Sequence, residues 1–480
     1  MSKKAQQASL SSVGFSFGKP YLAFSAKAWK ILVIFMLGLL AWIGADRYLT
    51  PELAPVAAIA VVCLGFWASA VMPEYWTALA FFLVAMITQI APPETVFSGF
   101  ETSTFWLLFA GLVLGAAIKF TELDNQVARL LTRLPFQTYA GTLAGIVAGS
   151  VALAFLVPSS IGRIMILLPV ISALAAQLGF GTQSNGRTGL LVAACFATFA
   201  PAFTILPANA PNMILVGMSE AQYGLEFSYF DYLLLHFPVL GLVKSGVIIG
   251  LTLLFFPDHM PARGDVTPQT PEPVSRAQAL LIAILALCLI LWLMDAWHGI
   301  SPAWIGLAAA LVCLWPSLKL TSPKCINQDL SYGALLFVAG IMGLGALIGH
   351  AGLGEALVAA ASDWINLSPQ TPVWNLSVLT GMSTLVAMAT SLPGVPAVMT
   401  PMAGDLAQAS GLTVTTVLMT QVLAFSNVFL PFQAPPLVVA IQAGNLRAGA
   451  VIRFCLALFA ISLCLLVPLD FLWWVLLGQI

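Results

Sequence analysis

Residues 156–179 read LVPSSIGRIMILLPVISALAAQLG, and this stretch decides the fold. A polar Pro-Ser-Ser tip interrupts the apolar sequence, and Arg163 follows four residues after Ser159. Each apolar arm beside the tip has about ten residues and is too short to cross a bilayer alone, since a crossing helix needs about 20. The pattern therefore predicts a re-entrant helical hairpin over residues 156–179, with its tip near the middle of the membrane.

A second stretch, residues 391–411, repeats the pattern of the first. It reads SLPGVPAVMTPMAGDLAQASG, and Ser, Gly, Pro and Gly recur in it at one constant offset of 232 residues. Such repeats in two halves of a hydrophobic chain are typical of transporters. The matching pairs are Ser159 and Ser391, Gly162 and Gly394, Pro169 and Pro401, and Gly179 and Gly411, with further matches between residues 109–111 and 338–340 and between residues 206–212 and 430–436.

The composition predicts an all-α polytopic membrane protein. Of the 480 residues, 60% are hydrophobic and 8% are charged, whereas soluble domains hold about 45–50% apolar and about 25% charged residues. The net charge of -1 gives no indication of a nucleic-acid partner. The seven cysteines include no C-x-x-C pair, so we interpret them as buried thiols rather than as metal ligands or disulfides.

One polar, Pro-rich stretch, residues 257–276, interrupts the apolar runs and is interpreted as a linker between two halves. The predicted units are a cytoplasmic N-terminal segment 1–30, a first half 31–256 with hairpin 156–179, the linker, and a second half 277–480 with hairpin 390–411. The positive-inside rule places the N-terminus in the cytoplasm, because five lysines precede the first span: Lys3, Lys4, Lys19, Lys27 and Lys30.

Arg163 carries the strongest functional signal in the sequence. A charge inside an apolar span costs at least about 2.5 kcal/mol, so it is a functional-site hypothesis by default. A guanidinium matches a carboxylate or a sulfate, and the start of the returning helix would point its positive dipole end at the tip. The alternative is a structural arginine that snorkels or pairs with a fixed acid.

Two breaks in apolar segments complete the predicted site. Leu206-Pro-Ala-Asn-Ala-Pro-Asn212 adds two side-chain amides, whereas the second-half break at residues 432–436 carries only Gln433 as a polar side chain. Broken helices expose carbonyls for a cation and amides for an anion. We expect no metal and no cofactor, with Na⁺ as a candidate coupling ion. The predicted substrate-binding residues are Ser159, Ser160, Arg163, Asn209, Asn212, Ser391, Gly394 and Gln433, and the predicted cation-binding residues are Ser159, Gly162, Ser391, Gly394 and Ala434.

Other ionisable residues in or near apolar segments are expected to be interfacial or interhelical. Asp405, on the return arm of the second hairpin, is the best of them for a proton-linked carboxylate. The stretch 119–133 has the pattern of an amphipathic interfacial helix. The other members of the set are His236, Lys244, His350 and Glu355.

These motifs resemble those of the divalent anion/sodium symporter family over roughly residues 50–475. Pro158-Ser-Ser-Ile-Gly-Arg163 is most similar to the Pro-Ser-Asn-Thr-Ala-Arg form of the 2-oxoglutarate/malate translocators and of the citrate/succinate and tartrate/succinate exchangers. The chain departs from the motif at Ser160 and Leu392, which replace Asn, and at Ile161 and Pro393, which replace Thr. The resemblance implies about eleven transmembrane helices plus two re-entrant hairpins, in two inverted repeats, and a homodimer.

The prediction for function is a secondary active transporter of a small anion, a di- or tricarboxylate, in a bacterial inner membrane. It would work by Na⁺ symport, H⁺ symport or anion exchange with alternating access, and its partners would be the substrate, the lipid bilayer and a second copy. One alternative is a cation/proton antiporter or oxyanion efflux protein, which should need acids in the membrane. An intramembrane enzyme is the remote alternative, since the chain shows no H-E-x-x-H motif.

Overall fold

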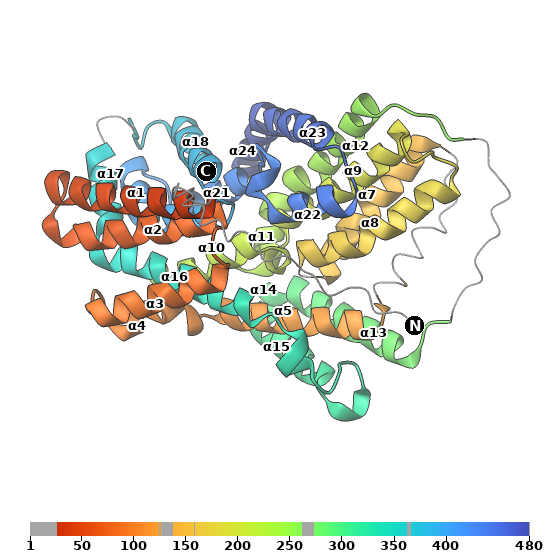
Figure 1. The fold of residues 1–480 in the computed structure, drawn as a ribbon, viewed down its shortest axis with the longest axis horizontal. Helices are drawn as coiled ribbons and strands as arrows, with labels where there is room; N and C mark the ends of the chain where they lie inside the picture. Colours follow the sequence, from red (N-terminus) through yellow and green to blue (C-terminus); the bar gives the residue numbers. More distant parts are fainter. Residues whose placement is uncertain are drawn as a thin grey trace, which may run out of the picture.

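The computed structural model describes residues 26–123, 126, 138–157, 159–261, 273–361 and 366–479. Every regular element in these ranges is helical (Figure 1), which confirms the predicted all-α class. Eleven helices in the described part of the chain are long and apolar enough to cross a membrane, as predicted. The predicted segment 1–30, the linker 257–276 and the interfacial helix 119–133 lie wholly or partly outside the described residues.

The first half begins with five helices, α1 to α5, before the predicted hairpin formed by α7 and α8. Of these five, α3 and α4 are too short to cross a membrane. The bounds are α1 Ala26–Tyr48, α2 Ala54–Ser69, α3 Glu74–Thr88, α4 Pro93–Val96, α5 Ser103–Phe120, α7 Tyr139–Leu156, α8 Ser160–Gln177, α9 Asn185–Phe199, α10 Ala210–Tyr223, α11 Tyr229–His236 and α12 Lys244–Phe255.

The second half contains the matching tip and helix break in the same order, with α19 and α20 together in place of α8. The bounds are α13 Arg276–Leu293, α14 Asp295–His298, α15 Pro302–Cys313, α16 Tyr332–Ala351, α17 Leu353–Ala361, α18 Pro372–Ala389, α19 Gly394–Met399, α20 Ala403–Ser410, α21 Val414–Phe425, α22 Pro435–Ala443, α23 Ala448–Ile461 and α24 Val467–Leu476.

Helices end and begin at both predicted tips. Helix α7 ends at Leu156 and α8 begins at Ser160, whereas α18 ends at Ala389 and α19 begins at Gly394. The arms are longer than the ten residues expected, because α7, α8 and α18 each have 18 residues. The re-entrant course of the hairpins remains a prediction.

The repeat extends to the backbone conformation of matching residues. Gly179 and Gly411 follow the two return arms and both have positive φ, 84° and 70°. Glycine adopts this conformation without a Cβ clash, so it is the residue that ends a helix there. The return arms differ at their matching prolines, since α8 continues through Pro169 whereas Pro401 lies in a 3₁₀ turn.

Each packed pair of helices has a counterpart in which every helix is replaced by the matching helix of the other half. Helix α5 packs against α15 and α16 packs against α3; α7 packs against α9 and α18 packs against α21. Across the halves, α8 packs against α22 and α10 packs against α19. In Figure 1 the first hairpin lies toward one end of the long axis and α17 and α18 lie toward the other. This exchange is the pattern of two repeats related by a pseudo-twofold axis.

The two helix breaks meet inside the protein. The first lies between α9 and α10, the second between α21 and α22, and the ring centroids of Phe203 and Phe425 are 5.6 Å apart. In the span that leads into the first break, 89% of the residues are buried. Irregular backbone is tolerated at membrane depth only where protein or a water-filled cavity surrounds it, and this burial provides that protection.

Candidate functional site at the hairpin tips and helix breaks

The tip of the first hairpin is organised by two serines with different environments. Ser159 is exposed and caps α8, because its hydroxyl accepts a hydrogen bond of 3.1 Å from the backbone N–H of Gly162. Ser160 is buried and hydrogen-bonds through its hydroxyl to the side chain of Asn209. Since Asn209 precedes the first residue of α10, this bond joins the N-terminus of α8 to the N-terminus of α10.

Arg163 is fully buried and connects three parts of the first half. Its Nη1 donates to the carbonyl oxygens of Val157, in the tip, and Ala208, in the break, the latter at 3.4 Å. Its Nη2 donates to Ser160 Oγ at 2.9 Å and to the Thr198 carbonyl, in the last turn of α9, at 3.0 Å. Among the described residues Arg163 pairs with no acid, so it is held by backbone carbonyls.

Asn212 stabilises the first break from within. Its Nδ2 donates to the carbonyl oxygens of Ile205 at 2.9 Å and Ala202 at 3.5 Å. Its side chain is fully buried, and its Oδ1 has no hydrogen-bond partner among the described residues. Asn212 therefore satisfies carbonyls that the broken helix leaves free.

Gln433 connects the break of the second half to neighbouring backbone by hydrogen bonds, as Arg163 does in the first half. Its Oε1 accepts hydrogen bonds of 2.8 Å from the backbone N–H groups of Phe429 and Leu430, and its Nε2 donates to the Ala387 carbonyl at the end of α18. The Leu392 N–H, in the second tip, donates to the Gln433 carbonyl at 3.4 Å. The break and the tip are thus held together through one buried side chain and its backbone.

The structure brings part of the predicted set into direct contact. Ser160, Arg163 and Asn209 share hydrogen bonds, whereas Ser391 and Gly394 are joined by a backbone hydrogen bond of 2.9 Å in the other half. Within the described ranges no hydrogen bond joins the two groups, which are connected through the packed breaks. Ala434 is buried beside the second break, and no cluster of three His, Cys, Asp or Glu side chains occurs in the described part of the chain. The binding roles remain predictions.

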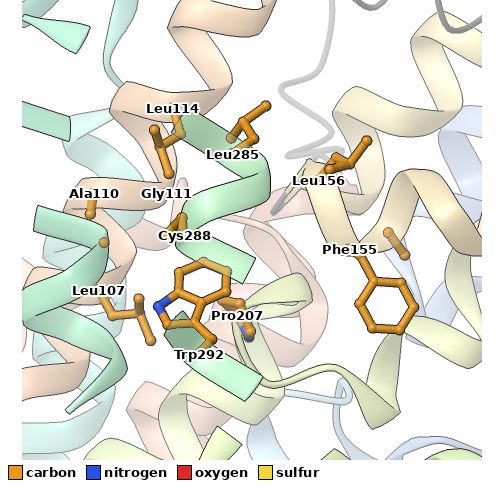
Figure 2. A pocket seen from close by; sticks show the side chains of 12 residues that line it. Leu107, Ala110, Gly111, Leu114, Phe155, Leu156, Pro207, Leu285, Cys288 and Trp292 are labelled. Atoms are coloured by element: carbon orange, nitrogen blue, oxygen red, sulfur yellow. The ribbon is translucent and has the colours of Figure 1, made fainter. Parts of the chain in front are cut away.

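An apolar pocket lies beside the first tip (Figure 2). Phe155 and Leu156 form one wall, Leu107 and Trp292 belong to the opposite wall, and Pro207 lies between them. The walls come from α7 on one side and from α5 and α13 on the other. An apolar lining does not suit an anion, so this pocket separates two packed parts rather than binding substrate.

A larger cavity of about 610 Å³ is lined by acids. Asp405, the carboxylate predicted to be proton-linked, lines it together with Glu94, Glu101 and His350. Carboxylates repel an anionic ligand, so this cavity is a poor binding site for a carboxylate substrate. Asp405 is half-buried rather than enclosed. It lies close both to solvent and to other acids.

Comparison with known proteins decides the family. Residues 64–425 match the family described as "Citrate transporter". The chain belongs to the citrate transporter family. This membership makes it a membrane transporter rather than an enzyme.

Several known proteins match the sequence of this citrate transporter family member at low identity. A "Membrane protein" of Cupriavidus necator is 24% identical over 80% of this chain and 77% of its own length. "Inner membrane protein YbhI" of Escherichia coli K12 is 23% identical, and the match spans about half of each chain, 53% and 54%. The "L-tartrate/succinate antiporter" of the same strain is 22% identical over 56% of this chain and 57% of its own length.

A solved structure shows the same fold. The Alcanivorax borkumensis YdaH transporter matches with a TM-score of 0.57 and 16% identity, over 94% of this chain and 98% of its own. At that identity the match supports the arrangement of helices and no more. It agrees with the multi-helix arrangement described above.

Proposed function

We propose that this protein is a secondary active transporter of a small di- or tricarboxylate, in the divalent anion/sodium symporter branch that its hairpin motifs resemble. One observation carries the proposal. The N-termini of α8 and α10 are held together by the hydrogen bond between Ser160 and Asn209, with the guanidinium of Arg163 bonded to Ser160. Two helix N-termini beside one permanent cation favour a carboxylate over a neutral or cationic ligand.

The second half supplies a smaller version of this arrangement. The second tip is bonded to the break that precedes α22, through Leu392 and Gln433, and the cation at this break, Lys244, is bonded to its other end at Ser426 and Asn427. A substrate with carboxylates at both ends would place its more strongly held group beside Arg163. The antiporter relative transports tartrate and succinate by name, and both are dicarboxylates of this kind.

Alternating access fits the way the molecule is divided. Each tip is hydrogen-bonded to its own break, so tips and breaks form one polar body. The apolar pocket at Leu156 and Pro207 (Figure 2) lies between the first tip and break on one side and α5 and α13 on the other. Packed helices can slide along an apolar contact of this kind, and the hydrogen bonds from Ser103 of α5 to Glu220 of α10 would have to break during the movement. We expect the polar body to move against the remaining helices in a homodimer of the inner membrane, with the N-terminus in the cytoplasm.

Counterflow in proteoliposomes tests the proposal. Vesicles loaded with unlabelled succinate, tartrate or citrate would receive a trace of the same labelled acid outside. We expect transient accumulation of label with at least one of the three and none with a matched monocarboxylate or in protein-free vesicles. Monodisperse protein that shows no counterflow with any di- or tricarboxylate, in sodium or potassium buffer, would contradict the proposal.

A further inference from the structure

Two π-helical segments bring ionisable residues together in the protein interior. Residues Phe237–Val243 form one segment between α11 and α12, and Ser462–Leu466 form the other between α23 and α24. The two segments pack against each other. His236 precedes the first, Lys244 follows it, and Asp470 lies just after the second; each is at most 1% exposed. π-segments inside α-helices are frequent at functional sites.

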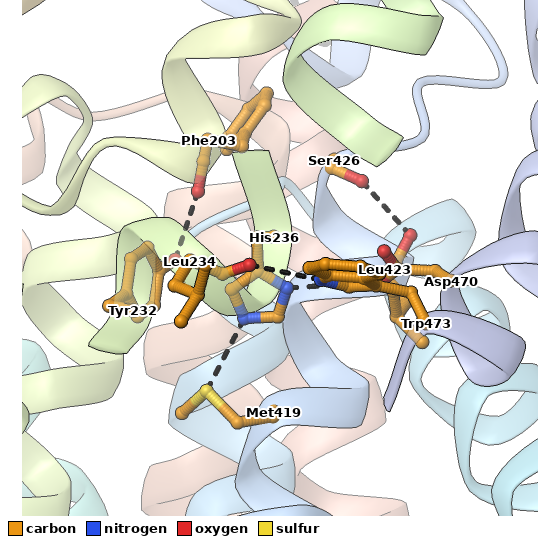
Figure 3. A network of polar contacts seen from close by, with 9 residues as sticks. All are labelled: Phe203, Tyr232, Leu234, His236, Met419, Leu423, Ser426, Asp470 and Trp473. Atoms are coloured by element: carbon orange, nitrogen blue, oxygen red, sulfur yellow. Dashed lines mark hydrogen bonds and ion pairs between the residues drawn. The ribbon is translucent and has the colours of Figure 1, made fainter. Parts of the chain in front are cut away.

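His236 and Asp470 face each other without a hydrogen bond (Figure 3). His236 Nδ1 lies 3.9 Å from Asp470 Oδ2, which is beyond hydrogen-bond distance. Among the described residues His236 Nδ1 and both carboxylate oxygens of Asp470 have no hydrogen-bond partner. Leaving such groups unpaired in the interior costs free energy, so a pair that served only to stabilise the fold would be expected to close.

The surroundings of the pair are apolar or aromatic. His236 Nε2 lies 3.4 Å from Met419 Sδ of α21, and the rings of Tyr232 and Trp474 lie 4.9 Å and 5.8 Å from the imidazole. The ionisable groups facing the pair from the packed helices are Tyr232 on α11, Lys244 on α12 and Cys455 on α23. Among the described ionisable residues that face the pair, Lys244 is the only cation.

Lys244 connects this cluster to the second break. Its Nζ donates to the Ser426 carbonyl at 2.8 Å and to Asn427 Oδ1 at 2.9 Å, where α21 ends. Lys244 and Asp470 follow the two π-segments that pack against each other, so their charges can act on each other. A small cavity lined by Lys244, Asn427 and Ser462 extends from this point to the end of α9.

The geometry of the pair leaves room for one proton. His236 Nδ1 and Asp470 Oδ2 face each other at 3.9 Å, and neither atom has a hydrogen-bond partner among the described residues. A proton added between them would close the gap with a charge-assisted hydrogen bond. It would also engage the Asp470 carboxylate and leave the charge of Lys244 to the second break.

We infer that His236 and Asp470 form a proton-binding site, and that Lys244 couples its occupancy to the helix break that helps to hold the substrate. A proton entering from the outer, more acidic side is carried with the anion and leaves on the inner side. The inference rests on the proposed carboxylate transport, to which it adds the coupling ion. His236 and Asp470 hold the proton; Lys244 is a positioning residue.

Two measurements on the same proteoliposomes separate coupling from transport. Counterflow needs no net proton movement, whereas accumulation driven by an inward pH gradient does. For one proton per substrate, a gradient of about one pH unit should raise accumulation by up to about tenfold. An entrapped pH dye should also report acidification when substrate enters wild-type vesicles without an imposed gradient.

The variants are Asp470→Asn and His236→Gln, with His350→Gln as the matched control at the acid-lined cavity. We expect both cluster variants to keep counterflow within about threefold of wild type and to lose pH-driven accumulation and dye acidification, while His350→Gln keeps all three. If one variant does not fold, the other variant decides. Wild-type vesicles that show counterflow but neither pH-driven accumulation nor dye acidification overturn this inference alone, as does pH-driven accumulation that survives both substitutions. Absence of counterflow overturns the proposed function as well.

Discussion

The ammonium of Lys244 donates a 2.8 Å hydrogen bond to the carbonyl oxygen of Ser426, the residue that ends α21. In the first half, the guanidinium of Arg163 donates to the carbonyl of Thr198 in the last turn of α9 at 3.0 Å. Both broken helices therefore end on a buried side-chain cation. The C-terminal ends of half-helices are places where transporters coordinate their coupling cations, and here the protein supplies the cation itself.

Transport should not require sodium. Because Arg163 and Lys244 occupy the negative ends of α9 and α21, a sodium ion there would meet two fixed positive charges. Replacing Na⁺ by K⁺ or choline on both sides of the membrane should change the initial rate of counterflow by less than about twofold. A saturable stimulation by Na⁺ at constant ionic strength would contradict this prediction.

Arg163→Ala should abolish anion uptake and also lower the thermal stability. The substitution removes the charge beside the α8 and α10 N-termini and leaves the carbonyls of Val157, Thr198 and Ala208 without this donor. An unpaired buried polar group costs about 1–3 kcal/mol. The measurements are uptake into proteoliposomes and the unfolding midpoint in detergent.

Arg187→Ala is the matched control for that arginine. Arg187 donates to the Thr182 carbonyl and to Ser172 Oγ and lies away from the tips and breaks. We expect it to keep most of the uptake. Wild-type uptake by folded Arg163→Ala protein would remove Arg163 from the proposed site.

Gln433→Leu should loosen the second tip. The substitution keeps most of the side-chain volume but leaves two backbone N–H groups and the Ala387 carbonyl without partners, each at a cost of about 1–3 kcal/mol. We expect a lower unfolding midpoint and a loss of uptake of at least about tenfold. Gln442→Leu, an exposed glutamine on α22, should leave both within error; equal effects of the two substitutions would argue against the role of Gln433.

Gly343→Ala should destabilise the contact between α16 and α4. A Cβ at Gly343 would lie 2.2 Å from the Val96 carbonyl oxygen, and a backbone atom cannot move aside as a side chain can. Overpacking of this kind costs about 1–3 kcal/mol. Gly381→Ala, where a Cβ would meet nothing within 4 Å, is the control and should unfold at or slightly above the wild-type temperature. An unchanged midpoint for Gly343→Ala would show that the two helices separate freely.

Much of the fold could be predicted because the apolar interior of the bilayer favours apolar residues along the whole length of a span. Long apolar runs locate such helices; α5, Ser103–Phe120, for example, holds a single charged residue, Lys119. The two tips could be located because proline and small polar residues interrupt those runs. The length of the hairpin arms was underestimated, because α7 reads in sequence like an ordinary span.

The sequence by itself determined the membrane class, the order of helices, the repeat from Ser159 and Ser391 to Gly179 and Gly411, and the presence of a buried arginine. Only the tertiary structure decided what that arginine touches, since its partners are backbone carbonyls and leave no trace in side-chain patterns. It also decided that His236, Lys244 and Asp470, far apart in the chain, meet at two π-segments. In a span that is apolar on all sides, the pattern of residues does not tell which face meets lipid and which meets protein, so contacts between helices had to come from the fold.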